Sequence, residues 1–412
     1  MSSLTTPSTR NDLALRARAE KVIPGGMYGH MAVNALVPPA YPQFWSRVDG
    51  AYGWDVDDNR YIDFMCAFGP MVLGYHNRVV QAAARKQAEL GDTMTGPSAL
   101  MVEFAELLVA TIPHAEWAIF AKNGTDATST AVRVARAATG KTKFLKATPA
   151  YHGANDWFTP IPTGVVESER ANIVYFDYND PASLEQAVSA HAGDIAAILV
   201  TPFQHDSFIP QESVTPAFAR RARELATQEG AALVLDEVRS GLRIDVRGAW
   251  EQLGVRPDLT AYSKALANGH PISALVGVDG LRDAASHIYV TGSFWYSAVP
   301  MAAGIATLTH AVEIDAPGVI GSAGRRFKDG LEAQGVAAGL PLRLTGPVQL
   351  PHLSFADDPE LKKAFAFTDA AIRHGVLLHP WHNMFVSTAH TDDVVDDALA
   401  RTERAFAELS VE

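Results

Sequence analysis

The feature that most constrains the fold is a regular alternation of apolar runs and amphipathic stretches that starts near residue 100. The apolar, strand-like runs are 117–121, 143–146, 173–176, 195–203 and 231–238. Helical spacing of apolar residues is found at 98–112, 125–138 and 215–230. Such alternation is typical of a mostly parallel sheet that helices cover on both faces. We therefore expect a large α/β domain.

A second, smaller domain is expected because 412 residues exceed what one hydrophobic core usually fills. Near the end of the chain, Thr391, Asp392 and Asp393 precede apolar residues at helical spacing, which predicts a capped closing helix. We assign residues 1–68 to an N-terminal segment that packs with the small domain. Residues 69–310 form the predicted large domain, and residues 311–412 form the predicted C-terminal small domain.

The composition argues against several classes of partner. A formal net charge of -12 is the wrong sign for neutralising nucleic-acid phosphates. No stretch approaches the ~20 apolar residues of a membrane-spanning helix, and the first residues lack the apolar core of a secretory signal. The single cysteine, Cys66, cannot form an internal disulfide or a sulfur-bound zinc site, which fits a reducing compartment. We expect a cytoplasmic protein that acts on small molecules without a metal ion, a nucleic acid or a membrane.

Polar residues that end the apolar runs are candidates for chemistry, because open α/β sheets bind ligands beyond the carboxyl ends of their strands. After the first run, Gly124 and Thr125 open a helix, where free N–H groups suit a phosphate. A plain helix cap is the alternative. The run AALVL ends in Asp236, which could keep a pyridine nitrogen protonated, and Val238 points to the same side of the strand. A magnesium ligand pair or a strand-end salt bridge explains Asp236 and Glu237 equally well.

The third candidate is Lys264, within LTAYSKALANGHP. It follows a short strand and precedes a loop that contains Gly269 and Pro271. A lysine among small and apolar neighbours has a lowered pKa, so its neutral amine can form a Schiff base and move a proton. Taken alone, a surface lysine is the simpler interpretation. The order of phosphate loop, Asp236 and Lys264 favours a site for pyridoxal 5′-phosphate.

These motifs resemble the class III aminotransferases of the type I pyridoxal-phosphate fold, and within them the glutamate-1-semialdehyde aminomutase branch. The matching segments include VIPGG (22–26), NGTDAT (123–128), YHG (151–153), DEVRSG (236–241) and SKALANGHPISALVG (263–277). Finer similarity, in GGMYGH, TGSFWYSAVPMAA and HPWHNMF, resembles fumonisin-degrading aminotransferases that use pyruvate. The resemblance implies a mostly parallel seven-stranded sheet flanked by helices, with a smaller α+β domain.

The resemblance also implies roles for individual residues. The cofactor-binding residues would be Gly124, Thr125, Tyr151, Asp236, Val238, Lys264 and Ser293. Lys264 would carry the Schiff base, Asp236 would pair with the pyridine nitrogen and Tyr151 would stack on the ring. Ser293 would reach the phosphate from a second subunit, which implies a homodimer with shared active sites.

Two departures from the family pattern concern the substrate. Where semialdehyde aminomutases carry an arginine for the substrate carboxylate, this chain has Ala32. That change removes a charge-assisted interaction worth roughly 1.5 to 3 kcal/mol. Arg239 occupies a position that is often Met or Gln in relatives. It either pairs with His205 or Asp206, or receives the carboxylate of a keto acid such as pyruvate.

The combined interpretation is a ping-pong transamination from an amine donor that lacks an α-carboxylate to a keto acid, with pyruvate as the expected acceptor. The substrate-binding candidates are Phe68, Arg239 and Trp295. Two alternatives remain open: an intramolecular aminomutase of the glutamate-1-semialdehyde type, and a nonenzymatic protein that keeps only the fold.

Overall fold

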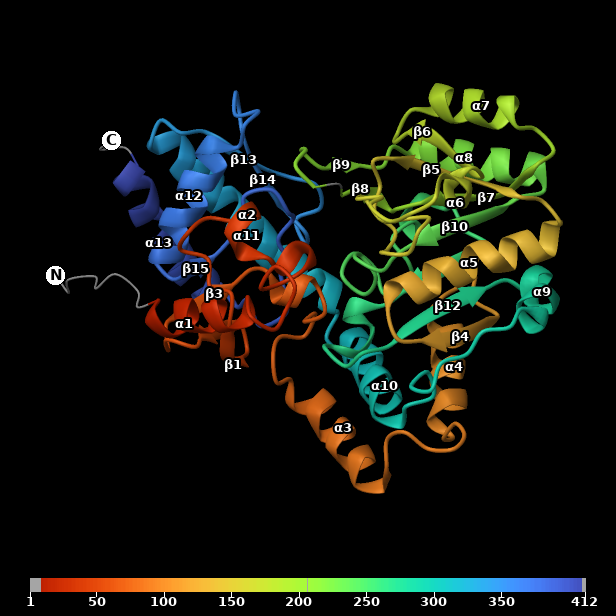
Figure 1. Ribbon diagram of the computed structural model, residues 1–412, viewed down its shortest axis with the longest axis horizontal. Coiled ribbons are helices and arrows are strands. Elements are labelled where there is room, and N and C mark those ends of the chain that lie inside the picture. The colour runs from red at the N-terminus through yellow and green to blue at the C-terminus, as the bar shows by residue number, and fades with distance from the viewer. Residues whose placement is uncertain (1–8, 206, 410–412) are drawn as a thin grey trace.

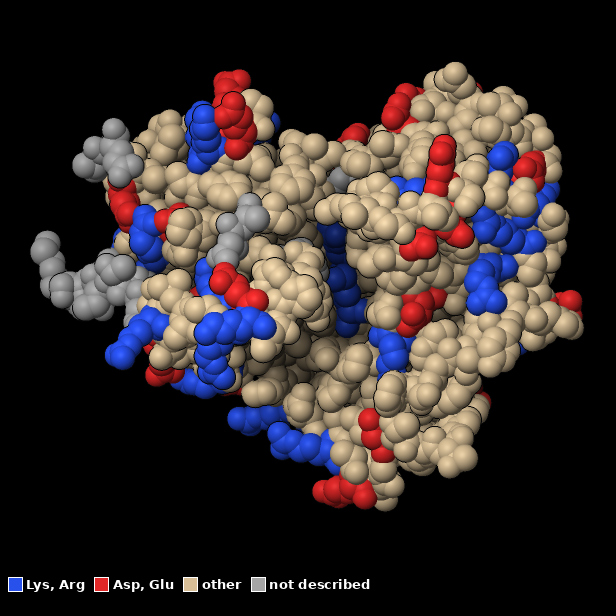
Figure 2. Space-filling model, viewed as in Figure 1, with Lys and Arg blue, Asp and Glu red and all other residues tan. Residues whose placement is uncertain are grey.

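The computed structural model describes residues 9–205 and 207–409. The chain forms two lobes, one around a seven-stranded sheet and one around a four-stranded sheet (Figure 1). Figure 2 shows a furrow between the lobes, with Lys and Arg side chains in its depth. Among the described residues, no helix is both long enough and apolar enough to cross a bilayer.

The large sheet has the strand order β4-β12-β11-β10-β7-β5-β6. Its strands are β4 (Trp117–Ala121), β5 (Lys143–Thr148), β6 (Ile173–Asp177), β7 (Ile195–Val200), β10 (Ala232–Asp236), β11 (Leu259–Tyr262) and β12 (Ser273–Gly277). β12 runs antiparallel to both neighbours, whereas β6, β5, β7, β10 and β11 pair in parallel. The predicted mostly parallel, seven-stranded sheet is confirmed.

Helices bury both faces of this sheet, which explains why its central strands β7 and β10 are almost continuously apolar. Leu233 and Leu235 of β10 belong to the same buried cluster as α7 (Pro181–Ala190) and α8 (Pro216–Glu229). The alternate residues Ala232 and Val234 belong to the cluster that includes α5 (Gly124–Thr139). Successive side chains of a strand point to opposite faces, so a strand covered on both sides must be apolar at every position.

One expected strand is shorter than its apolar run. The run 195–203 stops pairing at Val200, and Phe203–Gln204 forms the short strand β8 with β9 (Glu212–Ser213). Pro202 lies at the break, and proline has no N–H to donate to a sheet ladder. The chain therefore leaves the large sheet and forms a hairpin between the two lobes (Figure 1).

The smaller lobe combines both ends of the chain. Its strands are β1 (Trp45–Asp49), β2 (Tyr52–Asp55), β3 (Arg60–Asp63) and β15 (Val376–Leu377), with the hairpin β13 (Leu342–Thr345) and β14 (His352–Phe355). Its longer helices are α1 (Arg10–Ala19), α11 (Ala316–Ala337), α12 (Lys362–Arg373) and the expected closing helix α13 (Asp392–Leu409). β3 pairs in parallel with β15, with Ile62 opposite Val376. The domain borders themselves stay predictions.

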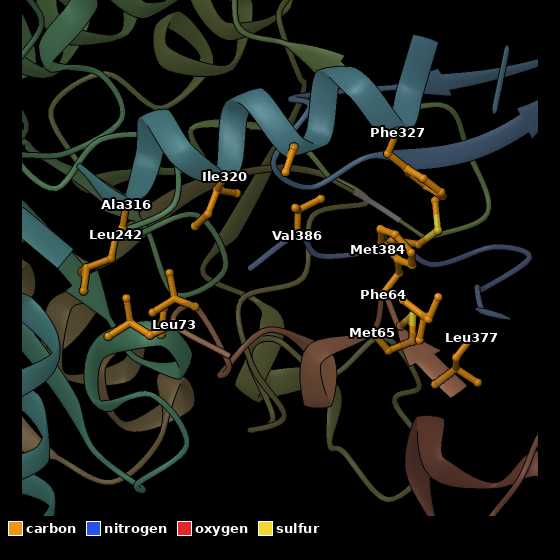
Figure 3. Close-up of a cluster of buried hydrophobic side chains, with 14 of the residues drawn as sticks. Phe64, Met65, Leu73, Leu242, Ala316, Ile320, Phe327, Leu377, Met384 and Val386 are labelled. Carbon is orange, nitrogen blue, oxygen red and sulfur yellow. The ribbon is translucent and has the colours of Figure 1, made fainter. Parts of the chain in front are cut away.

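The buried core is shared by segments from both lobes. Helices α3 (Arg78–Leu90), α4 (Leu100–Thr111) and α10 (Ala298–Glu313) contribute to it below the furrow. Figure 3 shows α11 lying over Leu242, which follows β10, and over Met384 and Val386, which follow β15. The rings of Phe64 and Phe327 stack with centroids 4.1 Å apart. This packing fixes the segments that reach the site from each lobe.

Candidate active site

A cavity of about 730 Å³ lies at the carboxyl ends of β10 and β11. Most of the predicted cofactor residues line it, together with Arg239: Gly124, Thr125, Tyr151, Asp236, Val238 and Lys264. The topology brings them together because the carboxyl ends of parallel strands meet at one edge of the sheet.

Lys264 follows β11 and begins a short 3-10 turn, Lys264–Ala267. Its φ of 42° is in the left-handed region, which non-glycine residues rarely occupy. Its Nζ donates a hydrogen bond to the backbone carbonyl of Phe68 at 2.8 Å. Burial, and then the guanidinium groups of Arg239 and Arg243, lower the pKa of Lys264 to about 7. A large share of the amine is therefore neutral, and hence nucleophilic, at neutral pH.

Asp236 is the last residue of β10, and its carboxylate is buried. One oxygen accepts a hydrogen bond from the N–H of Val238 at 3.0 Å, and the other lies 2.7 Å from Nδ1 of His152. The His152 side chain has no exposed surface, and its Nε2 has no hydrogen-bond partner among the described residues. Nδ1 of His152 donates its N–H to Asp236, because an ionised carboxylate can only accept a hydrogen bond.

His152 is a site residue that sequence reasoning missed. It directly follows Tyr151 in the YHG segment, but spacing alone gave it no role. The hydrogen bond between His152 and Asp236 joins residues that are 84 positions apart in the chain. The available signal was its place inside a matched motif.

The start of α5 is the segment predicted to bind a phosphate. Asn123 accepts a hydrogen bond from the N–H of Asp126, and the Asp126 carboxylate accepts one from the N–H of Asn123, both at 3.1 Å. These two residues form the helix cap that was the alternative interpretation of this segment. The N–H groups of Gly124 and Thr125 lie in the first turn, where a helix offers no internal acceptor. A Cβ at Gly124 would lie 2.7 Å from Val238, so only glycine permits this close approach.

Arg239 is buried in the cavity wall. Its Nη1 donates hydrogen bonds to the backbone carbonyl of His205 at 2.8 Å and to Oδ1 of Asn383 at 2.7 Å. The other predicted partner, Asp206, lies outside the described residues.

Tyr151 lines the same cavity and is partly exposed. Partial burial raises the pKa of its hydroxyl, and the charge of Arg239 opposes that shift.

Three predicted site residues do not line this cavity. Phe68 lines a small neighbouring cavity with His379, and its carbonyl accepts a hydrogen bond from Lys264. Ser293 is exposed and Trp295 is half-buried, both in the segment that precedes α10. The predicted role of Ser293 in the site of a second subunit stays a prediction. No group of three or more described His, Cys, Asp or Glu side chains could hold a metal ion.

Known proteins match nearly the whole chain. Residues 36–407 match the family model described as aminotransferase class-III. The chain belongs to the class III aminotransferases. It is 51% identical over 393 residues to aminopentol aminotransferase of Sphingopyxis macrogoltabida, across 95% of this chain and 93% of the relative. It is 32% identical over 406 residues to 3-aminobutyryl-CoA aminotransferase of Cloacimonas acidaminovorans (strain Evry), across 96% and 97%.

A solved structure gives the same result. The pyridoxal-phosphate internal aldimine form of the FumI protein of Sphingopyxis sp. MTA144 superposes with a TM-score of 0.96 at 50% identity, covering 97% of this chain and 96% of that chain. These matches confirm the predicted family, the type I fold and enzyme activity as an aminotransferase. They also confirm the cofactor, pyridoxal 5′-phosphate.

The cavity fits this cofactor chemically. Lys264 offers a buried amine whose pKa is lowered to about 7, and Asp236 offers a buried carboxylate for a protonated pyridine nitrogen. Gly124 and Thr125 offer first-turn N–H groups for a phosphate.

Proposed function

We propose that the enzyme takes an amino group from an amine that lacks an α-carboxylate and delivers it to a keto acid, with pyruvate as acceptor, in a ping-pong cycle. Amino transfer follows from the family. The observation that carries the choice of substrates is the placement of one guanidinium, Arg239, in the wall of the cavity that contains Lys264.

Arg239 offers one cationic site for a substrate carboxylate. Two of its hydrogen bonds go to the neutral oxygens of His205 and Asn383, and a carboxylate could replace these with charge-assisted bonds. Ala32 lines a different, smaller cavity that it shares with Arg16. Arg16 is bound to Asp12 and to the carbonyl of Tyr41. The keto acid therefore has a carboxylate site near Lys264, whereas the amine donor needs none.

The names of the relatives agree with such a donor. One is named for the amine aminopentol, and another for 3-aminobutyryl-CoA, in which the amino group is on carbon 3 and not beside the acyl carbon. An intramolecular aminomutase stays the alternative, and a requirement for an external keto acid would exclude it.

The proposed function gives roles to the cavity residues described above. When bound, pyridoxal 5′-phosphate supplies a ring that accepts the electron pair left at the substrate carbon. Asp236, held by His152, keeps the pyridine nitrogen protonated, and Val238 supports the ring from the Gly124 side. The first turn of α5 anchors the phosphate while no covalent link to Lys264 exists. Lys264 would take the proton from the amino-bearing carbon at its Nζ and deliver it to the carbon on the other side of the amino nitrogen, two bonds away.

We also propose that the enzyme is a cytoplasmic homodimer in which Ser293 of each subunit serves the site of its partner. The cytoplasmic location rests on the single cysteine and on the chemistry of a small-molecule enzyme. The dimer rests on the exposed position of Ser293 outside its own cavity.

The test separates the two half-reactions. We expect a panel of amines without an α-carboxylate to convert the absorbance of the loaded enzyme to that of the pyridoxamine form, and pyruvate to restore it. In Arg239→Met, the KM for pyruvate should rise about 10- to 100-fold, since a lost charged hydrogen bond is worth roughly 1.5 to 3 kcal/mol. The amine half-reaction should change little when both proteins are compared at a pH where Lys264 is neutral, because Arg239 also lowers the pKa of Lys264. Arg282→Met, on the surface, is the matched control. Equal losses in both half-reactions, or turnover without a keto acid, would contradict the proposal.

A further inference from the structure

The segment that leads into the cavity from the smaller lobe makes a left-handed turn. Cys66, Ala67 and Phe68 have φ values of 47°, 54° and 61°, and Gly69 follows with 112°. The left-handed conformation costs roughly 1–2 kcal/mol for each non-glycine residue. Consecutive residues stay in such a conformation only where the surrounding structure holds them there, and such strain gathers at functional sites.

Buried polar groups hold this turn from its N-terminal side. One oxygen of Asp63 accepts hydrogen bonds from the N–H groups of Met65 at 2.6 Å and Cys66 at 3.1 Å. Its other oxygen accepts one from the hydroxyl of Tyr75 at 2.6 Å. The carboxylate of Asp63 thus connects the start of the turn to Tyr75, which follows the turn in the chain.

The large domain holds the turn from its C-terminal side. Arg243 is fully buried and donates to the carbonyls of Gly69 and Val386, both at 2.5 Å. A Cβ at Gly69 would lie 2.8 Å from the ring of Phe385 and 3.2 Å from Cδ of Lys264. The turn is therefore clamped against the lysine side chain itself.

The turn places the carbonyl of Phe68 2.8 Å from Nζ of Lys264. A carbonyl can only accept, so the amine must donate an N–H to it. An amine held in this way keeps its lone pair free for a proton. Lys264 is itself in a left-handed conformation, so the backbone on both sides of this hydrogen bond is strained.

We infer that the turn 66–69 is a positioning element for Lys264: the Phe68 carbonyl holds the amine whenever it is not joined to the cofactor and directs its lone pair toward the substrate carbon. The inference rests on the proposed function, in which Lys264 moves the proton. In that step the C–H bond at the amino-bearing carbon would break and an N–H bond would form at Nζ, while the electron pair left on the carbon would be taken up by the ring of the bound cofactor.

Two variants test the turn. Ala67→Gly removes the steric cost of the left-handed conformation and gives the backbone more freedom. Gly69→Ala pushes on Lys264 and Phe385. Asp357→Gly is the matched control, because Asp357 is an exposed residue with a φ of 55° in the turn after β14.

We expect Ala67→Gly to keep or raise the melting temperature and to leave KM unchanged. It should slow the amine half-reaction roughly tenfold, since a misplaced catalytic group loses its orientation. The deuterium isotope effect at the amino-bearing carbon should increase. Gly69→Ala should show the same kinetic pattern at a lower melting temperature. If both variants match Asp357→Gly in rate and isotope effect, the turn has only a structural role and the inference is wrong.

A substrate-free measurement keeps this test independent of the proposed function. The apoproteins are mixed with pyridoxal 5′-phosphate, and the rate of capture by Lys264 is followed by absorbance. We expect slower capture in both turn variants and an unchanged rate in Asp357→Gly; equal rates in all would overturn the inference. A wild type that captures the cofactor but converts no amine would reject the proposed function alone.

Discussion

The reactivity of Lys264 is set by its immediate neighbours. Burial and the nearby guanidinium groups of Arg239 and Arg243 lower its pKa to about 7, from an ordinary value of 10.5. Below this pH the amine is protonated and cannot attack; above it, the neutral amine dominates. We expect the rate at which the apoprotein captures pyridoxal 5′-phosphate to rise with pH and to level off above about 7. Stopped-flow absorbance across neutrality measures this.

The same series has an internal check. Arg239→Met removes one of the positive charges that disfavour the ammonium form, so the midpoint should move to higher pH. A midpoint near 10 in the wild type would show that the amine is hydrated in solution, and the environment described for Lys264 would be wrong.

Some residues of the site could be predicted from the sequence, and others could not. Asp236 and Lys264 were found because each ends an apolar run, and the edge of a parallel sheet is where such residues meet. His152 and the carbonyl of Phe68 were not found, because each contact joins segments that are far apart in the chain. Hydrogen bonds across such separations depend on tertiary packing, which spacing does not encode.

At the scale of elements, the first turn of α5 depends on the closeness of Gly124 to Val238. A Cβ at position 124 would lie 2.7 Å from Val238, and overpacking of this kind costs about 1–3 kcal/mol. We expect Gly124→Ala to displace Val238 or the helix start and to weaken cofactor binding about tenfold. Titration of the apoprotein with the cofactor measures the affinity, and thermal unfolding measures the stability.

Gly280→Ala is the control for this change, because a Cβ there would meet nothing within 4 Å and its φ is not strained. If Gly124→Ala binds the cofactor as tightly as Gly280→Ala does, the close approach of α5 to β10 does not shape the cofactor site.

The central strands β7 and β10 were predictable because both faces of the sheet are buried there and the strands are almost continuously apolar. The strand predicted from the run 195–203 was wrong only at its end: β7 stops at Val200, before Pro202, although Phe203 is still apolar. The parallel pairing of β3 with β15 could not be predicted from the sequence, because it joins Ile62 to Val376 and β15 has only two residues. Short strands carry too few residues for an alternation to be visible.

For the whole molecule, the open question is how one chain completes its site. Exposed apolar side chains gather on α3 and α4 and include Val79, Leu90, Val102 and Val109. A cavity of about 480 Å³ lies between these helices and α10. Exposed apolar side chains are found at many protein–protein contacts, and the cavity beside these helices is lined in part by α10, the helix that follows Ser293. This arrangement supports the proposed homodimer.

Hybrid dimers test shared sites directly. We expect Lys264→Ala and Ser293→Asp each to be inactive as homodimers, the first without the lysine and the second because a carboxylate repels the cofactor phosphate. In a two-fold dimer with shared sites, a mixed pair has one intact site, so unfolding and refolding the two variants together should restore roughly a quarter of wild-type activity. Ser286→Asp, an exposed serine on α9 (Arg282–His287), should stay active and controls for the added charge. If Ser293 serves its own chain, both sites of the mixed dimer carry a defect and no activity returns.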